Sequence, residues 1–372
     1  MRRSTDRILA SHAGVLPRPA DFQRVWAGLP GSQAEFDTQL PGAVREVVRM
    51  QVERGLDVVN DGEISKVGGF SGYIRERMSG IEQHPWRGER PRRAPVNGRD
   101  RRDFPLFYES GRGATGANLG QAGEDPYFVV VPVKYTGHAA IQQDIDNVKA
   151  ACAGLDVEPF LPGIAPGTME HWLWNEYYPD EDSFVFGLAD MLNEEFKLVT
   201  DAGVIIQVDD PDLPDGWQMF PDWSVADYRK YADLRVEAIN RALNGIPEEL
   251  VRFHICWGSQ HGPHADDIPL REFIDLVYKV RAQCYSIEAS NSQHEHEWRV
   301  FEEKPLPDGK ILMPGVVGHA SDIIEHPLGV ADRILRYAKT SVAGNGWQAR
   351  GISGLGWWLH PPRPSSRSSL LT

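Results

Sequence analysis

Short apolar runs rich in β-branched residues recur along this chain, and each is followed by a polar or glycine-containing break. Helical stretches lie between most of them, and such alternation of strands and helices is typical of a parallel sheet. Eight strands, with no glycine-rich dinucleotide-binding motif after the first, favour a (β/α)8 TIM barrel over a doubly wound sheet. The eight runs are residues 7–12, 56–60, 158–164, 203–208, 251–256, 285–289, 311–317 and 349–355.

Apolar residues at spacings of three and four predict helices at 184–203, 225–243, 269–283 and 328–340. The segment from about 78 to 156 breaks the alternation, and we interpret it as an insertion after the second βα unit. It contains the β-rich stretch YFVVVPVKYTG, and we expect the insertion to pack a hairpin over one end of the barrel.

The domain boundaries follow from this pattern. We expect one barrel domain over residues 1–361 and an irregular tail at 362–372. Three prolines and a run of serines near the end disfavour a closing eighth helix. A homo-oligomer that covers the resulting gap is one expectation.

The composition excludes several classes of partner. A net charge of −14 argues against binding to nucleic acid or to anionic membranes. No apolar run approaches the roughly 20 residues that cross a bilayer, and no signal peptide is evident. With only three cysteines in 372 residues, we expect a cytoplasmic protein without disulfides. The basic stretch 87–102 is either a solvated loop or an arm that steers an anionic substrate or contacts a neighbouring subunit.

Polar and metal-capable residues recur where the predicted strands end, and catalytic residues of TIM barrels lie at that face. His254 and Cys256 are two residues apart on one strand, so their side chains point to the same side. With Glu288 from the next strand they offer three ligand types that zinc accepts. The alternative is a buried core thiol beside an interior histidine. The full set of strand-end residues is His12, Asp61, Glu63, Asp209, Asp210, His254, Cys256, Glu288, His319 and Ser353.

The carboxylates allow two interpretations. The DGE motif at 61–63 and the acids of VDDPDLPDG can cap the helices that follow them. Asp209 and Asp210 can instead bind an ammonium group, which suits an amino-acid substrate. The HEHEW motif at 294–298 is interpreted as a helix cap or rim rather than a metal site, and His261 and His264 as loop residues that shape the site.

Several motifs resemble the cobalamin-independent methionine synthase family, in particular its short, single-barrel members, which include epoxyalkane:coenzyme M transferase. The matching motifs are ASHAGVLPRP, GLDVVNDGE, QVDDPDL, FHICWG and SIEASN, and the likeness extends to about residue 361. The resemblance implies a zinc-dependent methyl- or alkyltransferase that activates a small thiol such as homocysteine. Its partners would be that thiol and a methyl or alkyl donor.

The resemblance also implies roles for individual residues. His254, Cys256 and Glu288 would bind zinc, together with position 353. His319 lies within one residue of the family's acid, and either Asp209 or Asp210 would bind the substrate amino group. We therefore predict catalytic roles for His319 and Asp209. The predicted substrate-binding residues are His12, Asp61, Glu63, Asp209, Asp210 and Trp257.

The chain departs from the family at strand eight, where Ser353 stands in place of a cysteine before Gly354-Leu355-Gly356. A serine hydroxyl is a poor zinc ligand, so the affinity for zinc should fall. The second, N-terminal barrel of the long synthases is also absent, which disfavours folate as the donor. Three alternatives stay open: an epoxide:thiol transferase, another reaction on a small anionic or amino-acid-like substrate with weak or no zinc, and an inactive binding barrel.

Overall fold

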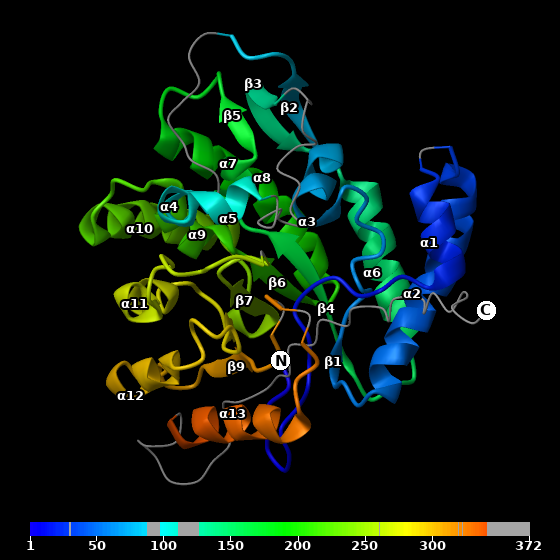
Figure 1. The fold of residues 1–372 in the computed structure, drawn as a ribbon. Coiled ribbons are helices and arrows are strands. Elements are labelled where there is room, and N and C mark those ends of the chain that lie inside the picture. The colour runs from blue at the N-terminus through cyan, green and yellow to red at the C-terminus, as the bar shows by residue number, and fades with distance from the viewer. Residues whose placement is uncertain are drawn as a thin grey trace, which may run out of the picture.

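The computed structural model describes the chain except for residues 30, 88–96, 111–125, 260, 319, 322 and 341–372. It is a mixed α/β fold in which a curled sheet of six parallel strands is surrounded by helices (Figure 1). The strands are β1 (Val58–Val59), β4 (Glu158–Ile164), β6 (Ile205–Asp209), β7 (Val251–Ile255), β8 (Cys284–Glu288) and β9 (Ile311–Gly315).

The strand order β1-β4-β6-β7-β8-β9 follows the order along the chain. A parallel bridge between Ser11 and Val58 adds the first predicted run beside β1. The first seven predicted runs are therefore neighbours in the sheet, in the same order as along the chain, as a succession of βα units requires. The eighth run, 349–355, and the tail at 362–372 lie outside the described residues.

Three of the four predicted helices are confirmed as α8 (Glu181–Asp201), α10 (Val225–Ala242) and α13 (Pro327–Thr340). Helix α8 begins where the side chain of Asp180 accepts the backbone N–H of Ser183, and α10 begins with a capping box between Ser224 and Asp227. The structure also has α1 (Ala20–Ala27), α2 (Gln33–Glu53) and α6 (His138–Cys152).

The predicted helix at 269–283 is wrong in extent. The structure has only a 3₁₀ turn at Leu270–Glu272 and the short α11 (Ile274–Val277). Phe273 lies between them with φ −143°, which breaks the helical ladder and buries its ring completely in the core. Tertiary packing of one aromatic ring thus overrides the helical spacing of the apolar residues.

A second sheet of three strands lies at one end of the molecule (Figure 1). In it β2 (Met78–Gln83) pairs antiparallel with β3 (Tyr127–Tyr135), and β3 pairs parallel with β5 (Leu173–Asn175). The range 78–156 therefore contains β2 and β3, and it ends with α6, which packs against α2 and α8.

The remaining elements are short. The helices are α3 (Gly69–Gly72), α4 (Gly98–Asp103), α5 (Pro105–Glu109), α7 (Pro166–His171), α9 (Asp212–Met219) and α12 (Val300–Glu303), and further 3₁₀ turns span Tyr73–Arg77, Glu248–Leu250 and Glu297–Arg299. Within the described part of the chain, no helix combines the length and apolarity needed to cross a membrane.

A buried arginine ties the small sheet to the helices. Arg77, just before β2, binds Asp144 of α6 at 2.6 Å and Glu195 of α8 at 3.5 Å. The hydroxyls of Tyr73 and Tyr135 also donate to Glu195. Both carboxylates are almost fully buried, so neither is stable as an ion without its partner.

We expect Arg77→Met to lower the free energy of unfolding by about 3–5 kcal/mol, because it leaves buried carboxylates unpaired. Urea denaturation followed by circular dichroism measures this change. The matched control is Arg49→Met, which removes the exposed ion pair with Glu53 within α2 and should change stability little. Equal losses in the two variants would contradict the role of Arg77.

Candidate active site

The carboxyl ends of β7 and β8 carry the three residues predicted to bind zinc. In the parallel register His254 lies opposite Ser286 and Ile255 opposite Ile287, so Cys256 and Glu288 follow at the next position. Side chains two residues apart on a strand share a face, which puts all three on one side. The backbone N–H of Trp257 donates to Oε2 of Glu288 at 3.1 Å, and Nδ1 of His254 lies 3.0 Å from Oγ of Ser286.

Cys256 is 8% exposed. Burial raises the pKa of its thiol well above the usual value, and the neighbouring charge of Glu288 raises it further. The register of β7 and β8 places the thiol and the carboxylate at equivalent, neighbouring positions. Imidazole, thiolate and carboxylate are donors that zinc takes, and a cation between the last two would relieve their repulsion. In the described parts of the chain, however, no three His, Cys, Asp or Glu side chains converge closely enough to hold a metal.

A second acidic group forms where β1 and β6 end. Glu63, at φ +54°, is buried with Lys66, whose Nζ lies 3.8 Å from Oε2 of Glu63 and 2.5 Å from the carbonyl oxygen of Pro162. Burial and the charge of Glu63 raise the pKa of Asp209 well above its usual range, and Lys66 opposes the shift. The carboxyl groups of Glu63 and Asp209 and the ammonium group of Lys66 thus form one buried cluster. Lys66 had no signal in the sequence beyond its position three residues after Glu63.

The neighbouring carboxylates are held by short-range contacts. Asp61 accepts the backbone N–H of Glu63 at 3.0 Å, and burial raises the pKa of Asp61 to about 6. Asp210 accepts the hydroxyl of Thr168 at 2.8 Å, and burial raises its pKa to about 7. None of Asp61, Asp209 and Asp210 is an N-cap of a described helix: α3 follows Gly68 and α9 follows Pro211, neither with a side-chain cap. Asp210 nevertheless contacts the first turn of α9, because its carboxyl accepts the backbone N–H of Leu213.

His12 is completely buried, with Nε2 2.9 Å from Oε1 of Gln51. Burial, assisted by the charge of Arg252, lowers the pKa of this imidazole to about 4. Arg252 also donates to the backbone carbonyl of His12. His12 is thus a neutral interior histidine. The other two predicted site residues, His319 and Ser353, lie outside the described residues.

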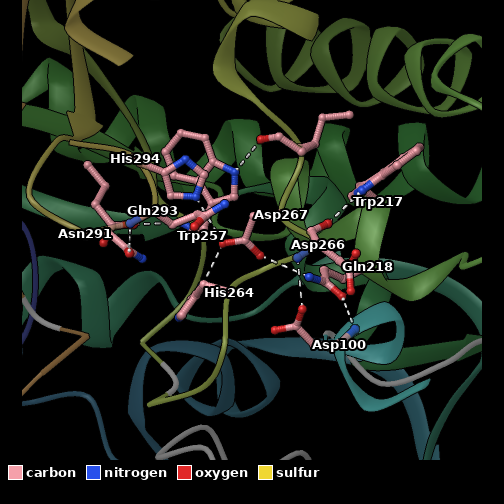
Figure 2. Close-up of polar contacts among 12 residues, drawn as sticks. Asp100, Trp217, Gln218, Trp257, His264, Asp266, Asp267, Asn291, Gln293 and His294 are labelled. Atoms are coloured by element: carbon pink, nitrogen blue, oxygen red, sulfur yellow. Dashed lines mark hydrogen bonds and ion pairs between the residues drawn. The ribbon is translucent and has the colours of Figure 1, made fainter. Parts of the chain in front are cut away.

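A buried network beside the site was missed by sequence reasoning (Figure 2). Asp267 accepts hydrogen bonds from Nδ1 of His264 at 2.7 Å, from Nε2 of His294 at 3.0 Å and from the amide of Gln218 at 3.0 Å. The rim interpretation of the HEHEW motif is wrong for His294, which is 2% exposed. The available signal was a histidine three residues before an acid, which occurs at both 264–267 and 294–297.

The same network reaches the helix α4. Oε1 of Gln218 accepts the backbone N–H groups of Arg99 and Asp100, and Asp100 accepts the N–H of Asp266. The guanidinium of Arg99 lies 3.4 Å from the centre of the Trp217 ring. It also donates to the backbone carbonyls of residues 217, 220 and 223. Part of the basic stretch 87–102 therefore docks on α9 rather than forming only a solvated loop.

Comparison with known proteins gives one consistent relationship. No protein-family model matches the chain. A methionine synthase of Sulfolobus acidocaldarius is 25% identical over 276 residues, which are 72% of this chain and 66% of that protein. A methionine synthase of Pyrococcus abyssi is 34% identical over 116 residues, 30% of each chain. The matches thus span less than two thirds of these relatives.

Solved structures agree on the fold. A B12-independent methionine synthase from Shewanella sp. W3-18-1, in complex with selenomethionine, superposes with a TM-score of 0.66 at 23% identity. It covers 94% of this chain and 90% of that one. A Listeria monocytogenes protein assigned as a vitamin-B12 independent methionine synthase gives a TM-score of 0.62 at 15% identity, over 94% and 92%. Sequence and fold together confirm the resemblance of this chain to the cobalamin-independent methionine synthase family.

Proposed function

We propose that the protein is a methyl- or alkyltransferase that activates a small, homocysteine-like thiol with zinc. The observation that carries the proposal is the placement of His254, Cys256 and Glu288 on one face at the adjoining carboxyl ends of β7 and β8. Relatives named methionine synthase support the same class of reaction.

Zinc would be held by His254, Cys256 and Glu288, with Ser353 as a weak fourth donor. A bound zinc ion supplies a thiolate at neutral pH, because a coordinated thiol is deprotonated outright. The chain itself then has two tasks, to orient the thiol and to supply a proton to the leaving group. We assign the second task to His319.

The buried acids at the ends of β1 and β6 would orient the substrate. Glu63 and Asp209 share one ammonium group, that of Lys66, so a second cation, the amino group of an amino-acid thiol, can be bound there. Asp210 lies next to Asp209 and would assist. His12, Asp61 and Trp257 are buried and would support this site from the interior, and Asp209 would have the catalytic role of fixing the thiol for attack.

A second candidate is a different reaction on a small anionic or amino-acid-like substrate, with weak or no zinc. The observation that favours it is the lack of a convergent three-donor group in the described part of the chain. An epoxide as the alkyl donor is a variant of the first proposal, since the same thiolate would attack it.

We expect the purified protein to bind about one zinc ion per chain, as a site of this donor set does. Cys256→Ser should abolish binding, measured by metal analysis after equilibration with zinc. The matched control is Cys284→Ser, which replaces a buried cysteine at the amino end of β8 and should retain zinc. Assays combine homocysteine or coenzyme M with methyl and epoxide donors. Unchanged turnover in a metal-free protein would contradict zinc activation and favour the second candidate.

The proposed ammonium site makes a separate prediction. Asp209→Asn should weaken the binding of homocysteine by about tenfold to a hundredfold, because a charge-assisted hydrogen bond is lost. The binding of 4-mercaptobutyrate, which has the same thiol and carboxylate but no amino group, should not change. Calorimetric titration of both thiols into both proteins measures this difference. Equal weakening for the two thiols would exclude an ammonium site at Asp209.

A further inference from the structure

His294 lies between two carboxylates in the interior of the protein. Its Nε2 is 3.0 Å from Oδ2 of Asp267, and its Nδ1 is 2.9 Å from Oε2 of Glu297. All three residues are at least nine-tenths buried. Although burial opposes it, hydrogen bonding to Asp267 and Glu297 raises the pKa of His294 to about 9. The ring is therefore an imidazolium with both N–H groups in use at neutral pH.

Each carboxylate that holds His294 is fixed from another element. Glu297 also accepts the backbone N–H of Leu270 at 2.7 Å, where the chain turns after β7. Asp267 also binds His264 and Gln218. The position of the imidazolium is thus set by three separate segments, namely the loop after β7, the loop after β8, and α9 (Figure 2).

The flat face of this imidazolium stacks on Trp257. The two ring centres are 3.7 Å apart and the planes are 15° from parallel, a geometry in which a cation and an indole attract each other. The indole N–H of Trp257 donates to the carbonyl oxygen of Ile268 at 2.9 Å. The backbone N–H of the same residue donates to Glu288. Trp257 therefore connects the imidazolium to a carboxylate of the candidate active site.

We propose that His294 is a positioning residue for the active site: anchored by Asp267 and Glu297, it holds Trp257 in place and thereby fixes the carboxylate of Glu288 beside Cys256. The inference deepens the proposed function, and rests on it only for the role of Glu288 as a ligand. Within the described part of the chain, His294 reaches the site through its stack on Trp257, so we assign it a positioning role and no catalytic one.

The test measures how well Cys256 is protected, because Cys256 directly precedes Trp257. Metal-free wild-type protein and the variants His294→Gln and Asp267→Asn are treated with iodoacetamide, and labelling at each cysteine is followed by mass spectrometry. We expect labelling of Cys256 to become about tenfold faster in both variants, as local opening becomes easier. Cys152 and Cys284 are also buried, and their rates should stay at the wild-type value.

Three further variants sharpen the result. In the double variant, labelling of Cys256 should be no faster than in the single variants, because His294 and Asp267 act through one contact. Glu303→Gln, which removes an exposed ion pair with Arg271, is the control and should leave all three rates unchanged. If His294→Gln or Asp267→Asn fails to fold, Glu297→Gln replaces it in the test, because this variant keeps the contact between His294 and Asp267.

A second readout links the labelling to the proposed metal site. The variants should bind zinc about tenfold more weakly than the wild type, while Glu303→Gln binds it normally. Unchanged protection of Cys256, or an equal increase at all three cysteines, would overturn the positioning role and leave only general stabilisation. If the wild type binds no zinc, the proposed function fails, whereas the labelling of Cys256 still decides whether His294 acts through Trp257.

Discussion

The in-register pairing of the parallel strands β7 and β8 is the constraint on which the proposed site depends. Four consecutive pairs, from Arg252 with Cys284 to Ile255 with Ile287, set the register. A slip of one residue would turn Glu288 to the opposite face, away from Cys256. The strands are buried along their length, apart from the half-buried His254, and burial on both faces penalises such a slip. The core thus determines the geometry of the site through register.

Burial also determines the electrostatics of the neighbouring acids. An ionised carboxylate loses hydration in the interior, and only opposite charges or hydrogen bonds offset that loss. At Arg77 the compensation is complete enough to stabilise the fold, since two carboxylates face one guanidinium and two tyrosine hydroxyls. At Asp209 and Asp210 the surrounding charges and hydrogen bonds do not offset the lost hydration, so the pKa of each carboxyl is raised. This contrast separates structural acids from acids able to receive a cationic group of a substrate.

Local patterns in the sequence were sufficient for much of the fold. Apolar spacing predicted α8, α10 and α13, and short apolar runs predicted the six strands of the main sheet. The helix at 269–283 failed because the packing of Phe273 competes with local spacing. The interaction of Glu63 with Asp209 arises because the ends of β1 and β6, which are far apart in the sequence, lie close together in the fold. The contacts of Asp267 with His294 and Gln218 join residues 27 and 49 positions apart, and no local pattern encodes such pairs.

The segment that contains α4 is connected to the same network. Gln218 uses its amide oxygen for the first turn of α4 and its amide N–H for Asp267. One side chain therefore joins the segment to the anchor of His294. An isolated helix of six residues has little stability of its own, so α4 (Gly98–Asp103) owes its position to Gln218 and to the carbonyl contacts of Arg99. In return, its backbone satisfies a buried amide that would otherwise lack a donor. The position of α4 and the position of Asp267 in the loop after β7 thus depend on the same side chain, Gln218. The basic stretch therefore has a structural role beside the site.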